Sequence, residues 1–124
     1  MSGPAVRAAA LFALLLACAA AAHAAGNKSA APNRYGAIAY QRESQAWGVG
    51  YDTARARDAE IVALRECGRR DCVVVHKFKN GCAALVSSAK AFVTASGATR
   101  DEAETKALNR CGAGCTPLAW GCTR

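Results

Sequence analysis

The sequence predicts a small α+β domain, built by duplication of a strand-strand-helix-strand unit and crosslinked by disulfides. Two observations lead to this fold class. Seven cysteines lie in a chain of only 124 residues, and such a density is typical of domains whose core is too small to be stable alone. A block of residues around two of these cysteines also recurs later in the chain. We expect one antiparallel sheet with two helices on one face, and three disulfides.

The N-terminal residues 1–24 are expected to be a signal peptide. Arg7 precedes an apolar run, Ala8 to Ala17, and Ala22-His23-Ala24 has the A-x-A form of a signal-peptidase site. We therefore expect cleavage after Ala24 and a periplasmic or secreted bacterial protein. Two alternatives remain open, an uncleaved alanine-rich anchor and lipidation at Cys18, which follows an approximate lipobox. Cleavage and lipidation both remove Cys18 from the disulfide count, which leaves six cysteines in the folded part.

The remainder of the chain predicts a flexible segment, residues 25–33, followed by a single domain, residues 34–124. The segment is small, polar and contains a proline. Without Arg7 the 16 basic residues become 15, and subtracting 9 acidic residues leaves a net charge of +6. Such a charge favours contact with anionic surfaces. We expect the mature chain to be a monomer without a transmembrane segment.

The internal repeat is centred on two predicted helices. Six positions of the block Ala59–Gly68 recur in Ala103–Gly112, at an offset of 44 residues (103 − 59), and a second cysteine follows each block. Stacked arrays need about three copies, so two copies predict one pseudo-symmetric domain.

The first unit reads as a hairpin, a helix and a strand. Tyr35 to Tyr40 and Ala46 to Tyr51 are short apolar segments around a polar turn, the pattern of a hairpin. Thr53 to Glu66 carries a stripe of alanines at helical spacing, which predicts a helix. Gly68 stands where a helix end favours a left-handed residue, and Val73 to Lys79 predicts a strand.

The second unit follows the same order. Cys82 to Gly97 predicts a hairpin whose turn contains Ser87 and Ser88. Thr99-Arg100-Asp101-Glu102 has the form of a capping box, with Thr99 as the N-cap of the second helix. That helix is expected to end at Gly112, and Leu118-Ala119-Trp120 is expected to form the last strand.

A set of landmarks occurs in a recognisable order along the chain. It begins with Tyr35-Gly36-Ala37-Ile38-Ala39-Tyr40 and Ala46-Trp47-Gly48, continues through Cys67-Gly68 and Asn80-Gly81-Cys82-Ala83-Ala84-Leu85, and extends to Cys122. This pattern resembles the exported bacterial proteins of the domain-of-unknown-function 4189 family. The resemblance implies export and a small disulfide-linked α+β domain, and it carries no established chemistry.

Six cysteines allow 15 disulfide connectivities, and the repeat favours one of them. Equivalent positions should be bonded equivalently, which predicts Cys67–Cys72 and Cys111–Cys115 and leaves Cys82 to pair with Cys122. Cross-pairing of Cys67 with Cys111 and of Cys72 with Cys115 is the alternative. Zinc ligation by these thiols is a weaker interpretation, because an exported protein meets an oxidising compartment.

Catalytic residues are sparse. His76 is the only histidine beyond the leader, and a hydrolase built on it would need Asp71 or a glutamate folded against it. Glu60 and Glu104 are repeat-equivalent carboxylates, but we expect them on solvated helix faces. We therefore expect no enzyme, no cofactor and no metal.

Four basic residues are the candidate partner-binding residues: Arg69, Arg70, Lys77 and Lys79. A solvated face is the alternative. No nucleic acid is expected as a partner, because aromatic residues are not interleaved with these charges. Trp47 and Trp120 are expected to lie in the hydrophobic core rather than to form a ligand platform.

These observations favour a non-enzymatic binding module of the bacterial envelope or exterior, which recognises an unknown protein or an anionic partner. An inhibitor or immunity-type protein is one form of it. The alternatives are a secreted effector that acts on other cells and a small hydrolase using His76.

Overall fold

The order strand, strand, helix, strand occurs twice in the computed structural model, whose described residues are 31–124. The predicted signal peptide, Cys18 and residues 25–30 of the predicted flexible segment lie outside these residues. The elements are β1 (Tyr35–Gln41), β2 (Ala46–Thr53), α1 (Ala56–Cys67), β3 (Val73–Lys79), β4 (Cys82–Ser87), β5 (Phe92–Gly97), α2 (Arg100–Cys111) and β6 (Thr116–Cys122). The α+β class and the duplicated unit are therefore confirmed.

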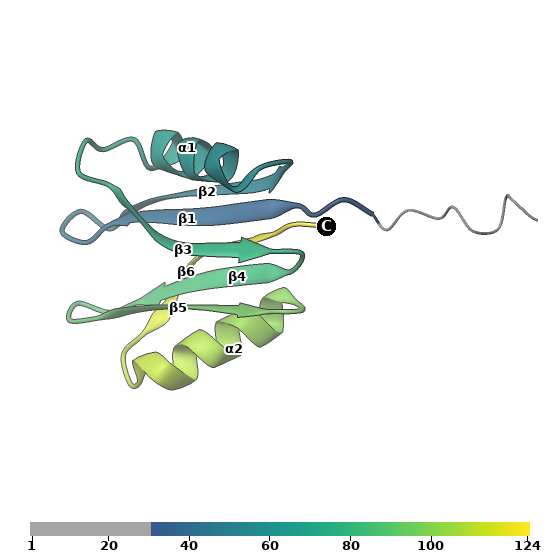
Figure 1. The fold of residues 1–124 in the computed structure, drawn as a ribbon. Coiled ribbons are helices and arrows are strands. Elements are labelled where there is room, and N and C mark those ends of the chain that lie inside the picture. The colour runs from purple at the N-terminus through teal and green to yellow at the C-terminus, as the bar shows by residue number, and fades with distance from the viewer. Residues whose placement is uncertain (1–30) are drawn as a thin grey trace, which may run out of the picture. The chain divides into compact units, whose positions relative to one another are not determined.

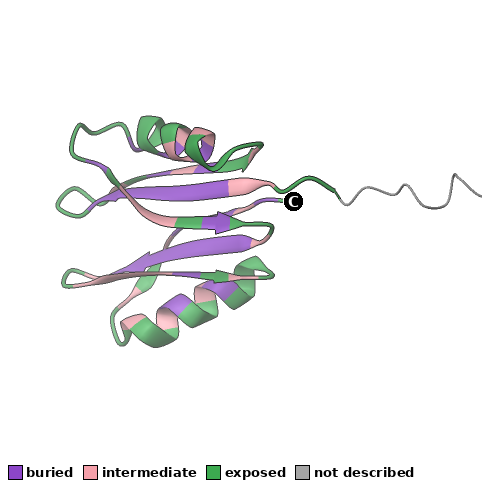
Figure 2. Ribbon diagram, in the orientation of Figure 1, coloured by how far each residue is buried: buried purple, intermediate pink, exposed green. Residues whose placement is uncertain are grey.

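The strands form two antiparallel three-stranded sheets, with the orders β2-β1-β3 and β5-β4-β6. This differs from the single sheet with both helices on one face that the sequence led us to expect. The two sheets pack face to face, and each carries its own helix on its outer face, α1 on one and α2 on the other (Figure 1). The reason lies in the central strands: β1 and β4 are buried along almost their whole length (Figure 2), so each needs cover on both faces.

The core between the sheets contains the large side chains, and the cores under the helices contain small ones. Ile38 and Leu85 are fully buried between the sheets, with Tyr40 and Phe78 beside them. Under the helices the buried residues are mostly alanines and half-cystines. Each helix therefore approaches its sheet closely and buries little apolar volume, as the alanine stripes predicted.

Two glycines of β2 make the close approach of α1 possible. A β-carbon at Gly48 would collide with the carbonyl of Ala63, and one at Gly50 would collide with the carbonyl of Ala59. Interior glycines often mark such an approach of another backbone.

The helix ends follow the predicted capping residues. The Thr99 hydroxyl accepts a hydrogen bond from the Glu102 backbone N–H at 3.1 Å, and the Glu102 carboxylate accepts one from the Ala98 N–H at 3.0 Å. The glutamate thus reaches one residue further back than in an ordinary capping box. Gly68 takes the predicted left-handed conformation, with φ +73° and ψ 8°. Gly112 has a positive φ of +90° but a ψ of −164°, so the left-handed conformation predicted there is not found.

The three disulfides join Cys67 to Cys72, Cys111 to Cys115 and Cys82 to Cys122. The first two connect each helix C-terminus to the loop or strand that follows it, at repeat-equivalent places. Cys82 and Cys122 are opposite each other on β4 and β6, with Cα atoms 4.0 Å apart. This third bridge therefore connects the last strand, β6, to β4, the central strand of its sheet.

We expect the Cys82–Cys122 bridge to stabilise the domain most, because it closes a loop of 40 residues against 4 for Cys111–Cys115. In the chain-entropy model, the double substitution Cys82→Ala/Cys122→Ala lowers the free energy of unfolding by about 4 kcal/mol, and Cys111→Ala/Cys115→Ala by about 2 kcal/mol. Urea unfolding of the two variants measures the difference. Equal losses would contradict the argument from loop length.

Candidate functional site

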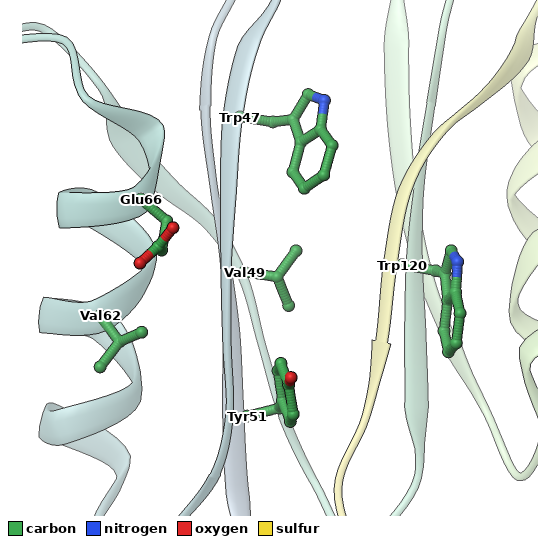
Figure 3. A pocket seen from close by; sticks show the side chains of 6 residues that line it. All are labelled: Trp47, Val49, Tyr51, Val62, Glu66 and Trp120. Atoms are coloured by element: carbon green, nitrogen blue, oxygen red, sulfur yellow. The ribbon is translucent and has the colours of Figure 1, made fainter.

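A groove of about 590 Å³ runs along β2. Trp47, Val49 and Tyr51 project from one side of this strand toward β6, as Figure 3 shows. Val62 and Glu66 of α1 line the other side. Trp120 also lines the hollow, with its ring on the side of β6 that points away from β2 in Figure 3. We call these six residues the aromatic groove.

The aromatic rings of this groove are open to solvent. Trp47 is 42% exposed, Tyr51 57% and Trp120 44%. Our expectation that the two tryptophans belong to the core was therefore wrong. Both lie on edge strands of their sheets. Trp47 is on the face that points toward the other sheet, and Trp120 is on the face covered by α2, where it pairs with Ala84 and contacts Arg100. The alternation of Trp47, Val49 and Tyr51 along β2 was a visible signal, whereas Val62 and Glu66 could be found only from the fold.

A second hollow of about 260 Å³ continues from the groove and shares Trp47 and Trp120 with it. Here the guanidinium of Arg100 lies 4.4 Å from the ring centroid of Trp120, within the range of a cation–π contact. Glu104 holds Arg100 through an ion pair of 2.8 Å. The Trp120 ring is thus supported from α2, which keeps this wall of the groove in place.

His76 lies on the other side of the sandwich, where β3 meets β5. Its Nε2 is 2.6 Å from the Ser96 hydroxyl, and its Nδ1 is 3.0 Å from the Thr94 hydroxyl. Burial lowers the pKa of His76 below its ordinary value of 6.5, because desolvation disfavours the charged imidazolium. The neutral ring joins the two sheets through two hydroxyl groups.

The hydrolase alternative required a carboxylate against His76, and the structure places none there among residues 31–124. The Asp71 carboxylate instead accepts a hydrogen bond of 3.1 Å from the Gln41 side chain. Both ring nitrogens of His76 have hydroxyl partners. A hydroxyl orients an imidazole but does not stabilise its cation as a carboxylate does. The cluster is thus better suited to joining strands than to activating a nucleophile.

The groove and the histidine cluster occupy equivalent places in the two repeats. On β1, Ile38 lies between Val49 and His76, and on β4, Ala83 lies between Ser96 and Gly121. A β-carbon on Gly121 would come within 2.6 Å of Val49 Cγ1, just as His76 contacts Ser96. Val49 over Gly121 and His76 over Ser96 are therefore the same contact, made with apolar residues at one edge and polar residues at the other.

The four basic candidates do not form one cluster. Arg69 and Arg70 lie in the loop before β3, while Lys77 and Lys79 are near its end, and all four are exposed. A strand advances about 3.3 Å per residue, so Val73 and Lys77 alone are about 13 Å apart. The structure thus places two pairs of cations toward opposite ends of β3.

Glu60 and Glu104 are also kept apart, since they lie on α1 and α2 in the two outer layers. Within residues 31–124 no group of three or more histidine, cysteine, aspartate or glutamate side chains could hold a metal ion. Neither helix in that part of the chain is long and apolar enough to cross a membrane.

Comparison with known proteins places these features in context. The model of the family described as a domain of unknown function, DUF4189, matches residues 35–122. The protein Rv1269c of Mycobacterium tuberculosis is 34% identical over 88 residues, which cover 71% of this chain and 68% of that protein. Rv1813c of the same organism is 36% identical over 88 residues, covering 71% and 59% of the two chains. The NMR structure of Rv1813c matches with a TM-score of 0.60 and 28% identity, over 96% of this chain and 99% of that one.

We expect the His76 cluster to make the stability of the domain depend on pH. Because the pKa of His76 is lowered in the folded state, the unfolded chain binds the proton more readily, and stability falls as the pH drops below 6.5. We expect the free energy of unfolding to decrease between about pH 7.5 and pH 5.5 in the parent protein. His76→Gln, which keeps a hydrogen-bonding side chain, should remove this dependence. An equal decrease in both proteins, measured by urea unfolding, would contradict the assignment.

Proposed function

The chain belongs to the DUF4189 family, as its landmarks predicted, and on that premise we propose an exported, non-enzymatic binding module of the bacterial envelope or exterior. The aromatic groove is its partner-binding surface in this proposal. The observation that carries it is the joint exposure of Trp47, Tyr51 and Trp120 around one hollow. Large aromatic side chains contribute most to binding when a partner covers them, and a contiguous exposed apolar patch is typical of interaction sites.

The difference between the two repeats supports this choice of surface. Trp47 lies opposite Tyr40 on β1, and its counterpart on β5, opposite Leu85, is Thr94. The fold therefore accepts a small polar residue at this position. Strand pairing therefore does not require an exposed tryptophan at this position. Its presence favours a role in binding.

The groove also changes the kind of partner we favour. Its lining has a single ionisable group with a formal charge, Glu66, and the adjoining hollow has the Arg100–Glu104 pair, so neither surface is basic. A protein partner thus suits the groove better than an anionic polymer, for which the two separated pairs of cations, in the loop before β3 and near the end of β3, are the better match. An inhibitor or immunity-type protein and a secreted effector are both compatible forms of such a module.

Export is the first part of the proposal to test. We expect a mature chain that begins at Ala25, inferred from the apolar run and the Ala22-His23-Ala24 site. Intact mass spectrometry of the protein from envelope and culture fractions measures this start. A species that begins at Cys18 and carries acyl chains would replace the proposal with a lipoprotein.

The binding surface is tested by site-specific photo-crosslinking in the producing bacterium. A photoreactive residue at Tyr51 should give a discrete adduct that disappears when Trp47→Ala is added, because the groove then loses an aromatic wall. The same residue at Arg69, an exposed site outside the groove, serves as the matched control. An adduct from Arg69 alone, abolished by Arg70→Glu and by salt, would transfer the function to the basic loop.

A further inference from the structure

We propose that the partner of the aromatic groove is an extended peptide segment that adds to the open edge of β2 as a further strand. This inference rests on the proposed function, since it names the partner of the same surface. Addition of a strand to a sheet edge takes its affinity from backbone hydrogen bonds and its specificity from alternate side chains.

The open side of β2 has unsatisfied backbone groups. β2 is the terminal strand of its sheet and pairs with β1 only. Among the described residues, no backbone hydrogen bond outside the β1 ladder involves the segment Trp47–Tyr51. Such a row of unpaired N–H and C=O groups is a template for another strand.

The other three edge strands carry features that discourage pairing. β3 bears Lys77 and Lys79, and β6 contains Pro117, which cannot donate a backbone hydrogen bond. On β5, the Lys106 ammonium donates a hydrogen bond of 3.3 Å to the carbonyl of Ser96. β2 has eight residues without lysine, arginine or proline. A bulge at Tyr51–Asp52, where Asp52 has a φ of +56°, limits the regular part of this edge to residues 46–50. This stretch is the edge that remains available.

The groove encloses this edge from both sides. In Figure 3, Val62 and Glu66 of α1 stand on one side of the β2 ribbon, and Trp47, Val49 and Tyr51 stand on the other. A strand laid along β2 would thus have every second side chain against the aromatic row. The side chains between them would face α1.

The two walls specify different side chains. Trp47, Val49 and Tyr51 offer apolar surface, which suits valine, isoleucine or leucine. On the other wall Glu66 is exposed, and none of the ion pairs of residues 31–124 includes it. A lysine or arginine of the partner is its natural complement. The partner is thus an extended segment with apolar residues at alternate positions and a basic residue opposite Glu66.

A synthetic peptide tests this directly. The probe is a capped ten-residue peptide of alternating valine and lysine, and its control has the same composition with the valines and lysines in two blocks. Both tryptophans of the chain line the groove, so intrinsic fluorescence reports on this site. We expect the alternating peptide to change the emission and to bind at least tenfold more tightly than the block peptide. The two peptides have the same backbone groups, but only the alternating one places all its valines against the aromatic row.

Backbone pairing is distinguished from side-chain contact by N-methylation of the probe. The N–H groups of alternate residues point to opposite edges of a strand. Methylation of the valine amides and methylation of the lysine amides should therefore differ: one series loses at least tenfold in affinity and the other keeps it. Equal binding of the two series would overturn the strand-addition model, and the proposed groove would still stand if Tyr51 crosslinks its partner.

The charge preference has its own matched pair of variants. Glu66→Gln should weaken binding of the alternating peptide about two- to fivefold, the range of an exposed ion pair. Glu60→Gln, on the same helix but outside the groove, should leave it unchanged. An unchanged affinity of Glu66→Gln would contradict the basic partner. A β2-paired dimer in sedimentation, with no peptide binding, would show a second copy of this chain as the occupant and overturn the proposal.

Discussion

The rest of the structure depends on the burial of β1 and β4 from both sides. Each is the central strand of its sheet, and almost all of its residues are buried. Neither repeat can cover such a strand alone, because one helix lined with alanines protects only the outer face. The inner faces must therefore pack on each other, and the large side chains of the domain, such as Ile38 and Leu85, are found there. The duplication is in this sense a requirement of stability.

This packing also explains why the two long edges of the sandwich differ. The arrangement of the sheets brings β2 close to β6 and β3 close to β5, at opposite edges. The contacts at the two edges are equivalent, Val49 with Gly121 and His76 with Ser96. At the histidine edge a large polar side chain bridges the sheets. At the other edge the glycine provides no side chain, and the rings of Trp47 and Tyr51 remain exposed beside it.

Much of this fold could be predicted from residues whose effect is local. The alanine stripes, Thr99 as N-cap and the glycines at the helix ends act within one helix, and both helices formed close to the predicted places. The first begins at Ala56 and not at the predicted Thr53, which is the last residue of β2. The disulfide pattern could be predicted because repeat-equivalent cysteines make equivalent bonds. The division into two sheets was missed because it depends on contacts between the repeats. The exposure of Trp47 and Trp120 was missed for the same reason. Their large apolar side chains suggest a place in the core, but their position on edge strands leaves them in solvent.

The candidate site shows how a duplicated domain can separate stability from binding. His76, Ser96 and Thr94 link the sheets at one edge with polar contacts that leave no large apolar surface open. Because the β3–β5 edge already links the two sheets, the equivalent β2–β6 edge is not needed to link them. It can therefore keep exposed aromatic rings. Edge strands are ordinarily protected by lysine or proline, and three of the four here have such protection. The exception, β2, is also the strand that carries Trp47 and Tyr51. The unpaired backbone and the exposed aromatic rings thus coincide on one strand, and the proposed binding of a partner there would satisfy both.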